Sequence, residues 1–204
     1  MMTKKLNEYR DEAFGIAVAH GWHDENLSDE HCKCLIISEL MEAVEADRKG
    51  RRADIKGAAR DLLAKDDFPT KCKTEETEKT ISFIFECDIA KPYRVFETYI
   101  KDTVEDELAD ACIRIFDLAG LRHINLWVDD LYGKSVTEDK SFTENIYTIC
   151  QKVLLYNNSL YICLNQTLKQ IFRLAKIEKI DLYKSIELKM EYNKLREYKH
   201  GKKY

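Results

Sequence analysis

The sequence predicts an all-α protein, and three observations carry this prediction. The 204 residues include only 7 glycines and 2 prolines, so few positions interrupt regular structure. The long stretches between them are rich in Leu, Ile, Ala, Glu and Lys, which favour helices. In several of these stretches apolar residues recur every three or four positions, as they do in helices that bury one face.

The same periodicity places each helix. In the segment 28–48 the apolar residues share one helical face, and Asn26 or Ser28 can cap its start. Lys49 followed by Gly50 suits its end, because glycine readily takes the left-handed conformation that closes many helices. The predicted helices are 6–20, 28–48, 55–64, 103–121, 143–156, 160–176 and 181–197.

Residues 66–101 differ from the rest of the chain. They contain both prolines, Pro69 and Pro92, and a run rich in Lys, Thr and Glu. Residues 81–85 then alternate in the manner of a short strand. We predict a small insertion here with a short β-hairpin, which serves either as a lid or as a surface excursion without a role.

Two pairs of carboxylates with equal spacing form the candidate site. Glu39 and Glu42 stand three apart on one predicted helix, and Glu107 and Asp110 stand three apart on another, so each pair projects from one helix face. Carboxylates are costly to bury together unless a hard divalent cation cancels their repulsion. We therefore predict that these four residues bind Mg²⁺, for which Mn²⁺ can substitute.

The flanks of these pairs resemble a known family. Segments 34–50 and 104–120 are similar to the two metal helices of MazG-like nucleoside triphosphate pyrophosphohydrolases, whose pattern is Glu-Glu-x-x-Glu followed by Glu-Glu-x-x-Asp. Ser38 replaces the first glutamate and Asp106 stands in for the third, whereas the four ligand positions match. The resemblance implies a MazG-like helical bundle that spans one domain, residues 1–204.

Further matches imply how a substrate is bound. The segment around Trp22 resembles the aromatic segment before the first metal helix, and Trp22 is expected to stack on a base or to be an ordinary half-buried aromatic. Lys189, Asn193 and Arg196 fall at i, i+4 and i+7 on one helical face, so they can approach a phosphate chain together. His200 is a further candidate phosphate contact. The alternative for this basic end of the chain is a solvated helix end.

The resemblance implies hydrolysis of a nucleoside triphosphate to the monophosphate and pyrophosphate, with Mg²⁺ on the phosphate oxygens and water attacking the α-phosphorus. Glu39 or Glu42 is the expected catalytic base. Two alternatives stay open. The chain is a non-catalytic helical scaffold or partner-binding protein, or it is an enzyme that acts on a nucleoside diphosphate or another phosphoanhydride.

An internal echo predicts a duplicated helical hairpin, because the segment beginning at Arg114 resembles the segment beginning at Gln170, at an offset of 56 residues. At this offset Cys163 takes the place of Glu107 and Gln166 takes the place of Asp110. The second half is therefore degenerate. This arrangement resembles all-α dUTPases, in which one half of a duplicated bundle keeps the metal and the other serves as scaffold.

Composition limits the partners and the compartment. A net charge of −4 favours neither a nucleic-acid polymer nor an anionic membrane, and no apolar run reaches the roughly 20 residues of a membrane span. Seven cysteines and a start without an apolar signal core predict a reduced, cytoplasmic protein. We expect a homo-oligomer such as a homodimer, because two metal helices need others to cover their apolar backs. If residues 143–197 fold back as a second half, the chain can complete a bundle alone.

Overall fold

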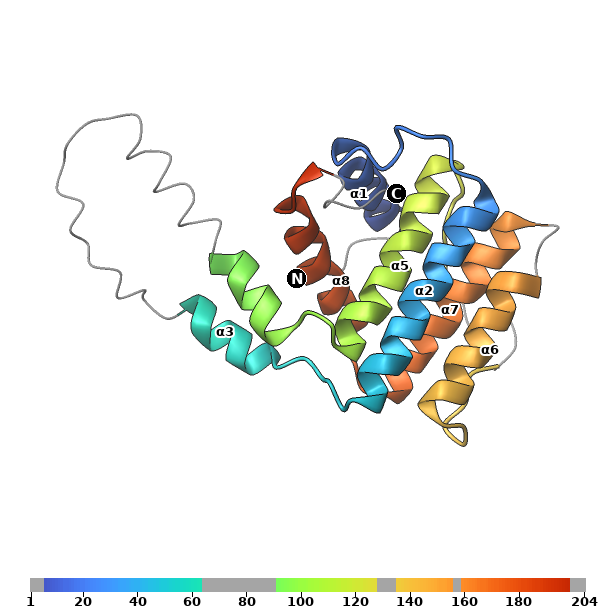
Figure 1. Ribbon diagram of the computed structural model, residues 1–204. Helices are drawn as coiled ribbons and strands as arrows, with labels where there is room; N and C mark the ends of the chain where they lie inside the picture. The colour runs from blue at the N-terminus through green and yellow to red at the C-terminus, as the bar shows by residue number, and fades with distance from the viewer. Residues whose placement is uncertain (1–5, 64–90, 128–134, 156–158, 199–204) are drawn as a thin grey trace, which may run out of the picture. The chain divides into compact units, whose positions relative to one another are not determined.

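The computed structural model describes residues 6–63, 91–127, 135–155 and 159–198, and all regular elements within these ranges are helices (Figure 1). The all-α prediction is confirmed for these residues. Most of the predicted hairpin region, including the alternating residues 81–85, lies outside the described residues. Residues 91–99 form a helix, which the sequence analysis placed in the insertion without a helical pattern.

The chain divides into two compact units, one made of Met1–Arg52 with Asp102–Tyr204 and the other of Ala53–Lys101. The second unit holds α3 (Ile55–Leu63) and the helical residues 91–99. Within it, the Asp54 backbone N–H donates to the Tyr99 carbonyl at 3.0 Å, and the Tyr99 hydroxyl donates to Asp61 at 2.7 Å. The predicted 66–101 insertion falls in this unit, and all the predicted metal ligands fall in the first unit.

Four helices of the first unit close into a ring around a common core (Figure 1). Helix α5 packs against α2 and α7, and α6 packs against both α2 and α7. Helices α1 and α8 pack on α5 and on each other. The helices of this unit are α1 (Leu6–Ala19), α2 (Asp29–Arg48), α5 (Val104–Leu121), α6 (Phe142–Leu155), α7 (Leu160–Ile177) and α8 (Leu182–Lys194).

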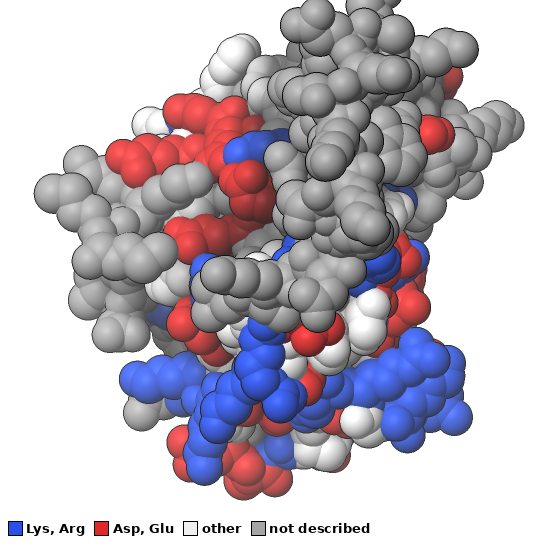
Figure 2. All heavy atoms as spheres, turned by 90° about the vertical axis from the view of Figure 1, so that its left-hand side faces the viewer, with Lys and Arg blue, Asp and Glu red and all other residues white. Residues whose placement is uncertain are grey.

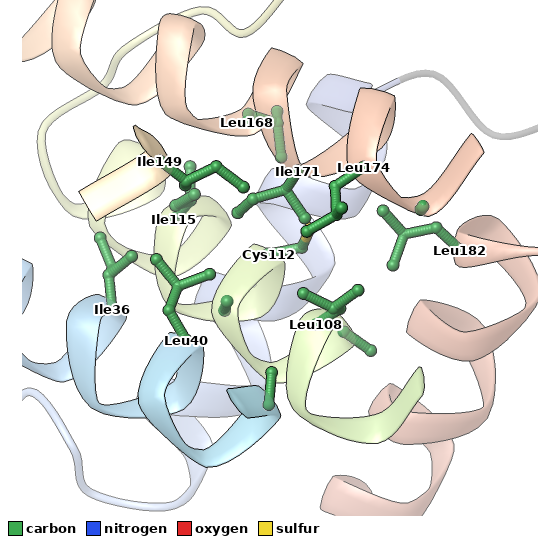
Figure 3. Packing of buried hydrophobic residues seen from close by; sticks show 14 of the residues in the cluster. Ile36, Leu40, Leu108, Cys112, Ile115, Ile149, Leu168, Ile171, Leu174 and Leu182 are labelled. Carbon is green, nitrogen blue, oxygen red and sulfur yellow. The ribbon is translucent and has the colours of Figure 1, made fainter. Parts of the chain in front are cut away.

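The core of the ring is apolar and drawn from all four helices. Figure 3 shows their side chains converging between the ribbons, with Leu182 of α8 at one side. The burial of these side chains is the main force that holds such helices together. Fully buried members include Ile36, Leu40, Leu108, Cys112, Ile115, Ile149, Leu168, Ile171 and Leu174.

Helix ends confirm most of the predicted boundaries. Ser28 caps α2, because its side chain accepts a hydrogen bond from the His31 backbone N–H at 3.2 Å. Gly50, just after the helix, has φ +64°, the conformation for which glycine was expected there. Helix α8 ends at Lys194, three residues before the predicted end at 197. Arg196 therefore lies beyond the helix.

Helices α5 and α7 are alike in length and in both ends. Their first residues, 104 and 160, and their last residues, 121 and 177, are each 56 apart. Thr103 and Ser159 cap their starts, and His123 and Lys179 follow their ends with φ of +54° and +59°. These likenesses fit the predicted duplication, which stays a prediction about the origin of the chain.

The ring of four helices affects the prediction that the protein is a homo-oligomer. A second copy of the chain was expected to bury the apolar faces of α2 and α5, but α6 and α7 of the same chain pack against them. The homo-oligomer therefore stays a prediction, and the reason given for it no longer requires a second copy.

Among the described residues, none of the helices is long and apolar enough to span a membrane. Figure 2 shows both signs of charge on the face that it draws, as the near balance of 33 basic and 37 acidic residues leads one to expect.

Candidate metal centre

Three of the four predicted metal ligands come together in the first unit. Glu39 of α2 and Glu107 and Asp110 of α5 each offer a carboxylate oxygen, and these oxygens all lie within 4.8 Å of one another. Glu39 and Glu107 are buried and Asp110 is half-buried. Glu42 lies one turn along α2 from Glu39, with its side chain exposed and accepting a hydrogen bond from the Ser38 hydroxyl at 3.3 Å.

Glu107 is the unusual member of this group. The residue is only 4% exposed, yet its carboxylate makes no hydrogen bond or ion pair with any residue that the structure describes. Burying an ionised carboxylate without a partner costs several kcal/mol in real proteins. A proton, a cation or water that reaches its oxygens must therefore offset the charge of Glu107.

Lys189 is a buried cation that contacts two acids of α5. Its Nζ is 2.8 Å from Oδ1 of Asp106 and 2.7 Å from Oδ2 of Asp110, and the residue is 4% exposed. Asp106 and Asp110 are four residues apart on α5, so both face the α8 helix that carries the lysine. Asp106 thus receives a cation from within the chain.

Arg114 anchors Glu39 from the other side of the cluster. Its Nε donates to Oε1 of Glu39 at 3.0 Å, which fixes that carboxylate across the α2–α5 interface. The guanidinium carbon of Arg114 is also 5.8 Å from the ring centroid of Trp22, within range of a cation–π contact. Arg114 therefore links the predicted base-stacking residue to a predicted metal ligand.

The cluster perturbs the acid–base behaviour of its members. Burial raises the pKa of Glu107 to about 9, with Asp106 and Asp110 adding repulsion. Burial raises the pKa of Asp106 to about 7 against the opposing pull of Lys189. Burial and then Asp110 raise the pKa of Glu39, although Arg114 opposes the shift. Burial alone would lower the pKa of Lys189, but Asp110 and Asp106 outweigh it and raise that pKa above its usual value.

A pocket lies beside this cluster. Trp22 and three leucines give it an apolar wall, and Arg114 stands between it and Glu39. His23 and Asp117 supply polar groups, with His23 Nε2 2.6 Å from Oδ1 of Asp117. The lining residues are Trp22, His23, Leu27, Cys32, Leu35, Arg114, Asp117 and Leu118.

The predicted phosphate-binding residues do not form one group. Lys189 is buried against carboxylates. Asn193 is half-buried on α8, and its Oδ1 has no hydrogen-bond partner among the described residues. Arg196, beyond the end of α8, has its guanidinium 5.6 Å from the ring of Tyr192. His200 lies outside the described residues. Their phosphate contacts stay predictions.

Sequence analysis missed Arg114 and the pairing of Lys189 with Asp106. Arg114 was discoverable, because it follows Asp110 by four residues and Glu107 by seven and so shares their helix face. The Lys189 pairing joins residues 83 apart in sequence, and no local pattern indicates it.

No family model, curated protein or solved structure matches this chain. The MazG-like resemblance thus stands on the quoted motifs alone, and the chemistry of the carboxylates has to carry the functional argument.

The three carboxylates suit one hard cation. Mg²⁺ binds oxygen ligands at about 2.0–2.1 Å, so two ligands on opposite sides of the ion are about 4.2 Å apart. Of three such ligands only one pair can be opposite and neighbouring ligands are about 2.9 Å apart, so oxygens that now lie within 4.8 Å of one another need to move by up to about 1 Å each to surround one ion. An ion there would also give Glu107 its missing partner.

Proposed function

We propose that this protein is a Mg²⁺-dependent nucleoside triphosphate pyrophosphohydrolase whose metal ligands are Glu39, Glu107 and Asp110, with Glu42 at the edge of the site. The observation that carries the proposal is the buried carboxylate of Glu107, which faces two other carboxylates and has no protein partner among the described residues. A chain that only scaffolds other proteins gains nothing from such an arrangement, because an apolar residue would be cheaper to bury.

The residues divide the work. Mg²⁺, when bound, supplies Lewis-acid chemistry that withdraws charge from phosphate oxygens and makes water a better nucleophile. Arg114 holds Glu39 in place through the 3.0 Å bond to Oε1. Glu42 is the better general base of the two candidates, because it is exposed and bonded only by Ser38 at 3.3 Å. Glu42 would take the proton as the water oxygen bonds to the α-phosphorus and the bond to the β-phosphate oxygen breaks.

The pocket beside the cluster carries groups that can contact a nucleotide base, but its cavity of about 20 Å³ has room for little more than a water molecule, so its lining side chains would have to move apart to admit a base. Trp22 offers a ring for stacking, the leucines exclude water, and His23 with Asp117 can hydrogen-bond to a base edge. Arg114 joins this pocket to the carboxylates through its contacts to Trp22 and Glu39. A base that entered the opened pocket would lie next to Arg114, which contacts the metal ligand Glu39.

The test is product analysis with the full-length chain. A panel of ribo- and deoxynucleoside triphosphates and diphosphates is incubated with the protein in Mg²⁺ and in EDTA, and the products are separated by chromatography. We expect a nucleoside monophosphate and pyrophosphate in Mg²⁺ and no turnover in EDTA. Release of orthophosphate from a diphosphate instead would favour the alternative reaction on another phosphoanhydride.

Substitutions locate the activity. Glu39→Gln and Asp110→Asn each remove a charged ligand and should abolish turnover while the helices stay folded. The matched control is Glu45→Gln on the same α2 helix, since Glu45 pairs with Arg48 and Lys49 outside the cluster. Full activity in both ligand variants, or no divalent-cation binding by the wild-type chain, would refute the metal assignment and favour the scaffold.

A further inference from the structure

Lys189 holds a position unusual for a lysine, at the buried end of a cluster of acids. Its ammonium contacts the carboxylates of Asp106 and Asp110 at 2.8 and 2.7 Å, and the side chain of Asp106 is only 1% exposed. Lysine is seldom so buried unless paired, and this lysine is paired twice. Lys189 is therefore a fixed part of the site and not a mobile surface charge.

Asp110 is shared between two differently filled halves of the cluster. Its carboxylate lies within 4.8 Å of those of Glu39 and Glu107, and none of the described cationic side chains forms an ion pair with Glu107. It also forms an ion pair with Lys189, which Asp106 shares. Two-ion sites use a comparable layout, with ions about 3.5–4 Å apart and carboxylates between them. Here an ammonium stands in the half where a second ion would be.

Charge balance supports the same division. The five carboxylates of this region are Glu39, Glu42, Asp106, Glu107 and Asp110, and the two cations are Arg114 and Lys189. Fully ionised, the group has a surplus of three negative charges. One divalent cation nearly balances that surplus. A second would reverse the sign and would have to displace a buried ammonium from two carboxylates, which is costly.

We propose that Lys189 is a positioning residue that takes the place of a second divalent cation and so limits the metal centre to one ion. The inference rests on the proposed metal centre and adds the number of ions to it. Removing the ammonium leaves Asp106 and Asp110, one turn apart on α5, without their cation, and Asp106 then keeps only the hydrogen bond from the Asp102 backbone N–H at 3.0 Å among the described residues. That arrangement should then accept a second ion.

The experiment counts bound Mn²⁺ by electron paramagnetic resonance of the free ion, in titrations of the full-length wild type, Lys189→Met and Lys189→Met/Asp106→Asn. Methionine keeps much of the length of lysine without the charge, and the double variant also removes the acid that the second ion would need. We expect one ion per chain in the wild type, two in the single variant and one again in the double variant. Thermal unfolding should show a larger rise in Tm with Mn²⁺ for Lys189→Met than for the wild type.

Each outcome decides the proposal. Two ions on the wild type, or one ion on a folded Lys189→Met, would overturn it while leaving the metal centre intact. If Lys189→Met does not fold even with Mn²⁺, Lys189→Gln takes its place, because its neutral amide can still hydrogen-bond to the carboxylates, and one ion on that folded variant would equally overturn the proposal. No binding by the wild type would remove the metal centre itself, and the inference would fall with it.

Discussion

Helices α5 and α7 share a length, matching caps and an offset of 56 residues, yet they use their polar positions in opposite ways. On α5 the inward polar residues are acids that gather at one site with α2 and α8. On α7 none of the buried polar residues is an acid, and two of them are amides that bind backbone: Asn165 accepts from the Trp127 N–H at 2.7 Å, and Gln170 accepts from the Val136 N–H at 3.1 Å. Two helices of the same length and with the same kind of ends can therefore use their buried polar residues either to gather charges at one site or to hydrogen-bond to the backbone of neighbouring loops.

The largest effect on activity should come from replacing Glu107 on α5, and replacing its counterpart Cys163 on α7 should have none. Glu107→Gln should lower the rate by at least about 100-fold, because a metal supplies several kcal/mol of charge stabilisation and about 1.4 kcal/mol is tenfold in rate. Cys163→Ala, at the counterpart position on α7, should keep the activity. Initial rates of pyrophosphate release measure both. Equal rates of pyrophosphate release in the two variants would contradict the assignment of the metal ligands to α5.

The apolar positions should respond alike on the two helices. Leu108 and Leu164 are counterparts and both are fully buried. Replacing either by alanine should lower the free energy of unfolding by about 2–5 kcal/mol, from lost burial and from the cavity left behind. Urea unfolding followed by circular dichroism checks this. A loss below about 1 kcal/mol at Leu164 would show that the α7 side of the core is loosely packed.

The free energy of unfolding should depend on pH because of the buried acids of α5. In metal-free protein the pKa of Glu107 is raised to about 9, so the folded state holds a proton that the unfolded state releases near pH 4.5. Stability should therefore fall as pH rises from about 4.5 towards 9, by at most about 1.4 kcal/mol per pH unit for one proton. Asp106, with its pKa raised to about 7, adds in the same direction between about 4 and 7.

The measurement is urea unfolding in EDTA between pH 6 and 8.5, for the wild type and for Glu107→Gln. The variant should show a shallower decline above pH 7, because its amide does not titrate. Saturating Mg²⁺ should also flatten the decline, since the ion favours the ionised carboxylate. A wild type whose stability rises with pH over this range would contradict the assignment.

The smallest effect is expected at the helix starts. Thr103 and Ser159 each accept a hydrogen bond from the backbone N–H three residues on, at 3.3 and 3.4 Å. Alanine at either position should cost about 1 kcal/mol. Thermal unfolding of the two variants should give similar drops in Tm. A much larger drop for Thr103→Ala would show that this cap also holds the carboxylates of the first turn of α5.

Local chemistry made most of the helices predictable. The cap at Ser28 and the turn at Gly50 follow from side-chain and backbone preferences that act within a few residues. The helical residues 91–99 were not predicted, because the prolines and the alternating residues within 66–101 favoured an insertion with a short hairpin.

The site was only partly predictable. Equal spacing on two helices indicated Glu39, Glu107 and Asp110, because a shared helix face is a local property. The partner of each face is set by packing between helices. For this reason Lys189, placed by sequence among phosphate ligands, lies instead against Asp106 and Asp110 in the structure.

The ring of α2, α5, α7 and α6 has a genetic consequence. In a symmetric homodimer every substitution appears twice, once in each copy. A residue suited to one role must therefore also be tolerated at the equivalent position of the other copy. Here both halves of the ring are encoded in one chain. A mutation at Glu107 leaves Cys163 untouched, and selection can act on the two positions separately. If the two helices arose by the predicted duplication, acids can be kept on α5 and lost on α7 independently.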